Sequence, residues 1–99
     1  MIVEHAVFAI TPGEEAAFER ALGDAIPHIS SAKGFRSLRM MRGIESPSQY
    51  ILLVEWETID DHMEGFRNSE AFAKWRSGLQ PFFAHAPELD HFTEVAHKP

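Results

Sequence analysis

Two different spacings of hydrophobic residues follow one another along this chain. Four stretches are apolar at alternate positions or nearly throughout, as in β-strands, namely residues 2–10, 35–44, 49–57 and 89–96. Between them, apolar residues recur every three or four positions, as on one face of an α-helix. These helical stretches are residues 13–31, residues 59–67 and a segment from about residue 69 to residue 79. The last two helical stretches lie between the same two strands and count as one helical element, so the predicted order of elements is β-α-β-β-α-β.

Polar residues and prolines mark the expected helix boundaries. Thr11 is expected to be the N-cap of the first helix, and Pro27 is expected to bend that helix or end its regular part. Thr58 is expected to cap the short helix, and Asn68 or Ser69 the helix that follows. These boundaries support three separate helical segments between the strands.

This order of elements predicts a ferredoxin-like α+β fold. Right-handed crossovers place four strands in one antiparallel sheet with the helices on one face. The centre of the third strand, residues 50–54, is apolar on both sides, so both faces of the sheet need cover. Two helices cover one face, and we expect a second copy of the chain to cover the other, giving a homodimer. Without a linker-like segment, residues 1–99 are expected to form a single domain.

Composition narrows the classes of partner. A chain of 99 residues buries roughly two-thirds of its unfolded surface, which favours help from a partner subunit. Fifteen acidic against nine basic residues give a net charge of −6, which argues against nucleic acid. The absence of cysteine excludes disulfides and thiolate chemistry. No apolar run approaches the ~20 residues that span a bilayer, so we expect a cytoplasmic protein without a membrane partner.

The most specific part of the chain combines a tryptophan at the end of the third strand with aromatic residues in the elements that follow. These features are Trp56 within residues 54–58, Phe66, the segment 68–72, and Phe92 within residues 90–95. Over nearly its whole length the chain resembles the antibiotic biosynthesis monooxygenase (ABM) domain family. The resemblance implies a dimeric α/β barrel. Members of that family include oxygenases that oxidise polyketide phenols or hydroquinones with O₂ and no cofactor, haem-degrading enzymes, and proteins with a non-oxidative or unassigned reaction.

The resemblance disfavours haem degradation. Haem-degrading relatives use an Asn, Trp, His triad, and other residues occupy those positions here. Ala6 stands in place of the Asn, Phe66 in place of the helical Trp, and Arg76 or its neighbour Trp75 in place of the His. No glycine-rich phosphate loop or nucleotide fingerprint is found, so neither a flavin nor a nicotinamide cofactor is expected.

Histidines are the candidate proton-transfer groups, because their protonation changes near neutral pH. His5 and His91 lie in neighbouring strands, so their rings could share one face, either as metal ligands or with one acting as a general base oriented by the other; alternatively each is a half-buried strand residue hydrogen-bonded to a neighbour. Without a third ligand at a suitable spacing, no metal site is predicted. His62 lies one turn before Phe66 and could take a proton from a phenolic substrate; alternatively it is an exposed helix residue. The other histidines, expected in solvent, are His28, His85 and His97.

Aromatic side chains are core residues by default, but as a group they could also line a flat apolar cavity for an aromatic molecule. The candidate substrate-binding residues are Trp56, Phe66, Phe72, Trp75 and Phe92, with Arg76 holding an anionic ring substituent. The arginines of the second strand, Arg36, Arg39 and Arg42, could play the same part, and surface pairing with the excess acids is the alternative.

The function predicted from these residues is a cofactor-independent monooxygenase that acts on a small phenol or hydroquinone. The candidate bases, in order of preference, are His62, His5 and His91. Two alternatives stay open: a non-catalytic module that binds a small molecule in the same cavity, and a non-oxidative isomerase or decarboxylase that needs the base but no O₂. An ionisable group with a perturbed pKa inside the cavity would favour an enzyme over a binding module.

Overall fold

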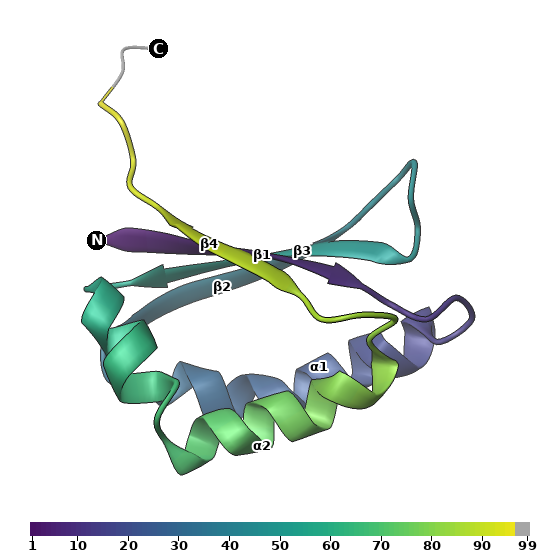
Figure 1. Ribbon diagram of the computed structural model, residues 1–99, viewed down its shortest axis with the longest axis horizontal. Helices are drawn as coiled ribbons and strands as arrows, with labels where there is room; N and C mark the ends of the chain where they lie inside the picture. Colours follow the sequence, from purple (N-terminus) through teal and green to yellow (C-terminus); the bar gives the residue numbers. More distant parts are fainter. Residues whose placement is uncertain (97–99) are drawn as a thin grey trace.

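The computed structural model describes residues 1–96 and has the predicted order of elements. The elements are β1 (Ile2–Ala9), α1 (Glu15–Ser30), β2 (Phe35–Arg42), β3 (Gln49–Trp56), the π-helical segment η1 (Asp61–Phe66), α2 (Glu70–Leu79), the short 3₁₀ turn η2 (Gln80–Phe82) and β4 (Glu88–Phe92). The four strands form one antiparallel sheet in the order β2-β3-β1-β4. Both helices lie on the same face of this sheet (Figure 1). The predicted ferredoxin-like fold is therefore confirmed.

Strand register decides which side chains face the helices. In β1 and β3 every second residue is buried against the helices, and the residues between them are half-buried on the opposite face. The buried set is Glu4, Ala6 and Phe8 in β1 and Tyr50, Leu52, Val54 and Trp56 in β3. Glu4 pairs with Val54 on one side and with His91 of β4 on the other. One acidic residue thus lies in the middle of the helix-covered face.

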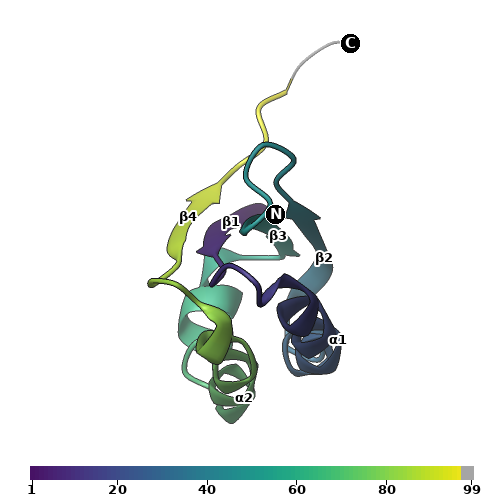
Figure 2. The same cartoon turned by 90° about the vertical axis from the view of Figure 1, so that its right-hand side faces the viewer.

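The core is filled unevenly between the two helices. Beneath α1, the ring of Phe18 is fully buried and meets the rings of Tyr50, Phe8 and Phe82 at centroid distances of 4.9, 6.1 and 6.3 Å. The Tyr50 hydroxyl donates a hydrogen bond of 2.5 Å to Glu19 at the edge of this cluster. Figure 2 shows α1 below the β2–β3 half of the sheet and α2 below the β1–β4 half. The α1 half is densely packed and mostly apolar.

The start of α1 differs from the prediction. Helix α1 begins at Glu15, and Thr11 is not its N-cap: its backbone carbonyl accepts a hydrogen bond of 2.9 Å from the Glu14 amide. Gly13 has a φ of +94°, so residues 11–14 form a turn that delays the helix. Pro27 was expected to bend the helix or end its regular part, yet α1 continues through it to Ser30. Proline removes one backbone N–H hydrogen bond there, while Ile29, two residues further on, is still buried against the core.

The last strand is shorter than predicted. β4 ends at Phe92, which pairs with Val3 close to the start of β1. Residues 93–96 continue the alternating pattern, but β1 begins at Ile2, next to the last paired residue Val3, and these residues lie outside the strand. At the other edge, β2 ends at Arg42 rather than at the predicted Ile44.

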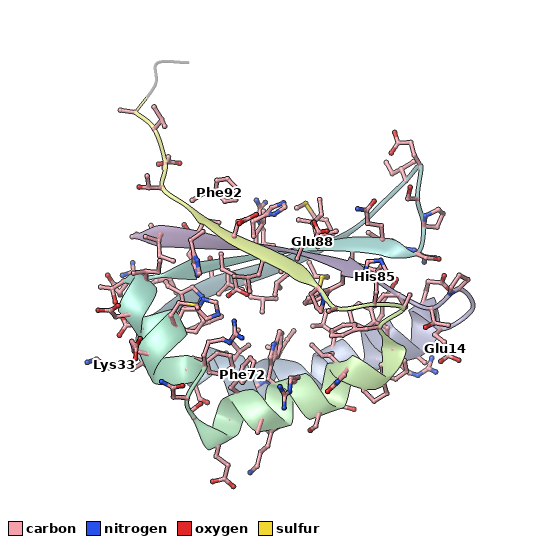
Figure 3. The ribbon with its side chains drawn as sticks, in the orientation of Figure 1. Glu14, Lys33, Phe72, His85, Glu88 and Phe92 are labelled. Carbon is pink, nitrogen blue, oxygen red and sulfur yellow. The ribbon has the colours of Figure 1, made fainter. Side chains whose placement is uncertain are left out.

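The face of the sheet away from the helices is uncovered in the described part of the chain. It carries Val3 and Val7 of β1, Ile51 and Leu53 of β3, and Phe92 of β4. Figure 3 shows Phe92 and Glu88 on this side, opposite the helices. Among residues 1–96 no helix has the length and apolar character needed to cross a membrane.

Candidate functional site

A cavity of about 580 Å³ lies between α2 and the β1–β4 half of the sheet. Its volume falls within the roughly 300–1,000 Å³ that small-molecule sites occupy. Aromatic and aliphatic side chains form most of the wall, and Figure 3 shows Phe72 pointing from α2 into this space. The polar residues of the lining are Glu4, His62, Arg67, Arg76, Gln80 and His85. The hollow is therefore apolar with a few polar groups, which is the usual character of a ligand site.

Glu4 is the buried acid of this cavity, with only 4% of its surface exposed. The indole Nε1 of Trp56 donates a hydrogen bond of 3.0 Å to Glu4 Oε1. Burial raises the pKa of Glu4 to about 7, although the Trp56 hydrogen bond and the Arg67 guanidinium act in the opposite direction. Near neutral pH the carboxyl group is thus divided between its protonated and ionised forms, and it can both accept and give a proton.

His62 lies beside Glu4 and is 2% exposed. Its ring stacks on the Trp56 indole, with centroids 5.0 Å apart and 14° between the planes. His62 Nε2 is 3.3 Å from Glu4 Oε1. Burial, together with the smaller effects of His91 and Arg67, lowers the pKa of His62 to about 4. The imidazole is therefore neutral at physiological pH and has a lone pair available for a proton.

The π-helical backbone of η1 places His62 at this position. The Arg67 amide donates to the His62 carbonyl at 2.9 Å, a spacing of five residues that widens the turn. Thr58 Oγ1 accepts a hydrogen bond of 3.1 Å from the Asp61 amide, so the predicted cap at Thr58 is confirmed. Gly34 has a φ of +85°, and a Cβ there would clash with the side chain of Asp61. The connection between α1 and β2 thus packs directly against the start of η1.

His91 completes a row of three polar side chains. Its Nε2 is 2.8 Å from His62 Nδ1, on the side of the imidazole away from Glu4. His91 is half-buried on the edge strand β4, whereas the other two are buried. We call Glu4, His62 and His91 the polar row. Because His62 stands in the middle with one nitrogen toward each neighbour, the three do not converge on one point, and residues 1–96 contain no cluster suited to a metal ion.

Two arginines stand at the cavity beside an aromatic ring. The guanidinium carbons of Arg67 and Arg76 lie 4.9 and 5.9 Å from the centroid of the Phe72 ring. Within residues 1–96 neither arginine forms an ion pair with a carboxylate. Exposed positive charge next to an apolar cavity favours an anion, or a group that becomes an anion, inside it.

Some of the residues predicted from the sequence lie elsewhere. The prediction that His5 and His91 share a face is wrong, because the register pairs His91 with Glu4 and places His5 opposite Asp90 on the uncovered face. There the His5 ring meets Phe92 edge to face, with centroids 5.8 Å apart. Phe92 is 55% exposed, so neither of these residues belongs to the cavity.

The structure brings other candidates together. Phe66, Phe72, Trp75, Arg76 and His62 all line the cavity, while Trp56 is fully buried beneath His62. His85, expected in solvent, is exposed at the rim of the cavity; His28 is half-buried near the end of α1, and His97 lies outside the described residues. In β2, Arg36 pairs with Glu57 and Arg42 with Glu19, which is the surface pairing considered as the alternative.

Glu4 was missed as a site residue. The sequence did carry a signal, since Glu4 lies in phase with Ala6 and Phe8 on the buried side of an alternating strand. An acid at such a position needs a partner inside the protein. That partner, the indole of Trp56, lies 52 residues further along the chain, and strand pairing brings the two together.

Comparison with known proteins agrees with this architecture. The sequence model of the antibiotic biosynthesis monooxygenase family matches residues 1–78, and the chain belongs to that family. The uncharacterized protein YczJ of Bacillus subtilis (strain 168) is 40% identical over 95 residues, which are 96% of this chain and 100% of YczJ.

Solved structures show the same fold. The crystal structure of a protein from Bordetella bronchiseptica, described as a candidate antibiotic biosynthesis monooxygenase, is similar with a TM-score of 0.92 and 39% identity, covering 96% of this chain and 97% of that one. SnoaB of Streptomyces nogalater, a cofactor-independent oxygenase, has a TM-score of 0.84 at 17% identity, covering 99% of this chain and 96% of SnoaB. At that identity the similarity to SnoaB concerns the fold alone.

Proposed function

We propose that this protein is a cofactor-independent monooxygenase that acts on a small phenol or hydroquinone. The main observation behind the proposal is the neutral, buried imidazole of His62 in an aromatic-lined cavity. It lies beside the carboxyl group of Glu4, whose pKa is raised. Membership of the monooxygenase family and the shared fold with SnoaB support the same reaction class. A perturbed pair of titratable groups in a cavity favours an enzyme over a passive binding module.

The reaction needs no external reductant. A phenol and O₂ give a quinone and water: one oxygen atom enters the ring, the other becomes water, and the substrate supplies all four electrons that reduce O₂. Removal of the phenolic proton produces an electron-rich anion that can pass an electron to O₂. Glu4 or His62 takes that proton, the aromatic walls keep bulk water from the anion, and Arg67 and Arg76 stabilise its charge.

Oxygen uptake tests the proposal directly. Purified protein is mixed with a panel of phenols and hydroquinones, and O₂ consumption is followed with an electrode. We expect uptake above background for at least one compound and a loss of about 10²–10⁴-fold in kcat for His62→Gln. His28→Gln, a half-buried histidine of α1 outside the cavity, is the matched control and is expected to retain wild-type uptake.

Other outcomes identify the alternatives. Tight binding of panel compounds, measured by calorimetry, without any O₂ uptake or product would establish a binding module. Conversion of a compound under anaerobic conditions would establish a non-oxidative isomerase or decarboxylase. Either result would overturn the monooxygenase proposal.

We also propose that the protein forms a homodimer through the uncovered face of the sheet. This proposal rests on the apolar side chains of β1 and β3 that have no cover from the helices. Leu53→Glu is expected to convert a dimer into a monomer in sedimentation velocity experiments. The control is Ile59→Glu, an exposed apolar residue before η1, which is expected to leave the dimer intact. A monomeric wild type would rule this interface out.

A further inference from the structure

We propose that the polar row is a proton relay in which His91 holds the substrate's proton while the substrate is an anion. The proposal rests on the proposed function and adds a role for a residue that does not line the cavity. Its basis is the geometry of three groups contributed by three different elements, β1, η1 and β4.

The contacts form a continuous path. Glu4 Oε1 lies 3.3 Å from His62 Nε2, and His62 Nδ1 lies 2.8 Å from His91 Nε2. A neutral imidazole has one donor and one acceptor nitrogen, so it can accept a proton at one side and release another at the opposite side. The Trp56 indole stacks on His62 and donates to Glu4, which holds both groups in line.

The transfer balances atom by atom. The substrate's O–H bond breaks as the proton joins the Glu4 carboxylate. That proton then moves to His62 Nε2, while the His62 Nδ1–H bond breaks and a bond to His91 Nε2 forms. The result is a substrate anion, an ionised Glu4, a neutral His62 in its other tautomer and a protonated His91. The reverse shift returns a proton to the reduced oxygen and completes the water molecule, so no proton is gained or lost.

Burial explains why the proton ends on His91. A charged imidazole is costly at His62, which is 2% exposed, and Arg67 adds a positive charge nearby. His91 is half-buried on an edge strand, so water can solvate the imidazolium. The other charged groups at the cavity are Arg67 at the end of η1 and Arg76 on α2, and both stabilise the anion that the transfer leaves behind. Asp90 and His5 lie on the opposite face of the sheet.

Chemical rescue tests the relay with a compound that the panel identifies as a substrate. His91→Ala is expected to lower kcat by about tenfold to a hundredfold with an unchanged KM, because the cavity keeps its lining. Added imidazole is expected to restore kcat in proportion to its concentration at pH 7. Pyrazole, which has the same shape but is a much weaker base, is not expected to do so. A kcat within twofold of wild type, or equal rescue by pyrazole, would overturn the relay.

A measurement on the free protein separates this proposal from the proposed function. ¹⁵N shifts of the imidazole nitrogens report which nitrogen carries hydrogen and whether it is hydrogen-bonded. We expect the His62 Nδ1 signal to move in His91→Ala and the His62 Nε2 signal to move in Glu4→Gln. An inactive wild type that shows both changes would refute the oxygenase but keep the proton path. An active wild type without them would refute the path alone.

Discussion

The two halves of the core, beneath α1 and beneath α2, differ in what fills them. Beneath α1 the aromatic cluster around Phe18 fills the space, and its polar Tyr50 hydroxyl reaches the edge, where Glu19 accepts its hydrogen bond. Beneath α2 the same sheet carries the buried Glu4 and His62 next to a cavity of about 580 Å³. Buried polar groups and empty volume both reduce stability. A densely packed half thus supports a hollow one within a domain of this size.

The sharpest test of this difference removes one phenylalanine from each half. Phe18→Ala opens a new void in a filled region and is expected to cost about 3–5 kcal/mol in the free energy of unfolding. Phe72→Ala enlarges a hollow that already exists beside a half-buried ring, and its expected cost is about 1–2 kcal/mol. Urea unfolding of both variants measures the difference. Equal losses would show that the two halves are packed alike.

Stability against pH separates the two buried groups of the α2 half. The pKa of Glu4 rises from 4.5 to about 7, so its contribution is complete below pH 4.5 and is lost as the pH rises through 7. The pKa of His62 falls from 6.5 to about 4, so its contribution is complete above pH 6.5 and is lost as the pH falls through 4. Each shift corresponds to about 3 kcal/mol. Between pH 4.5 and 6.5 the two effects oppose each other.

Single substitutions make these opposite slopes visible. In the Glu4→Gln variant, His62 is the only one of the two groups that still titrates. The free energy of unfolding of this variant is expected to rise as the pH rises from 4 to 6.5. In the His62→Gln variant, Glu4 is the only one of the two groups that still titrates. The free energy of unfolding of this variant is expected to fall as the pH rises from 4.5 to 7. Chemical unfolding at several pH values measures both slopes. Parallel pH profiles for the two variants would contradict the assigned shifts.

A smaller effect is expected where the α1–β2 connection meets η1. Gly34→Ala places a Cβ against Asp61 and strains a residue with a φ of +85°, so we expect a loss of about 2 kcal/mol or more. Gly13→Ala is the matched control, because Gly13 has a similar φ of +94° but open space around it. Its expected loss is about 1 kcal/mol. Thermal unfolding compares the two, and equal losses would mean that backbone strain alone accounts for both.

The smallest effect concerns the first turn of α2. Ser69 Oγ accepts a hydrogen bond of 3.2 Å from the Phe72 amide, which confirms the sequence's alternative of Ser69 as N-cap. Ser69→Ala is expected to cost about 1 kcal/mol. Ser77→Ala, an exposed serine within the same helix, is the control and is expected to change stability little. A neutral Ser69→Ala would show that packing alone defines this end of the helix.

The fold could be predicted from the sequence because hydrophobic spacing and helix boundaries are local signals. Strand and helix periods identified every major element, and the two-sided apolar third strand located the uncovered face. The errors arose at element boundaries that are determined by contacts between segments far apart in the sequence. Residues 93–96 alternate like a strand but follow the end of β4, which pairs at Phe92 with Val3 near the start of β1, and Thr11 has a capping side chain but lies in a glycine-containing turn.

The site could be predicted only in part. His62 and the aromatic residues near it were found because their spacing on one helix is visible in the sequence. The pairing of Glu4 with Trp56, and of His62 with His91, depends on strand register and on the π-helical widening of η1. A shift of one residue in β4 would place His91 on the opposite face. Register of that accuracy comes from the assembled sheet and not from the pattern of one strand.

Figure 2 shows both helices on one side of the sheet. The cavity is lined by helix-facing residues such as Glu4 and Leu52, so it lies on that side, opposite the uncovered face. A partner docked on the uncovered face would therefore leave the mouth of each cavity open to solution. The two binding sites of such an assembly would act independently, with hyperbolic saturation, a Hill coefficient of one and a specific activity that does not change as the enzyme is diluted.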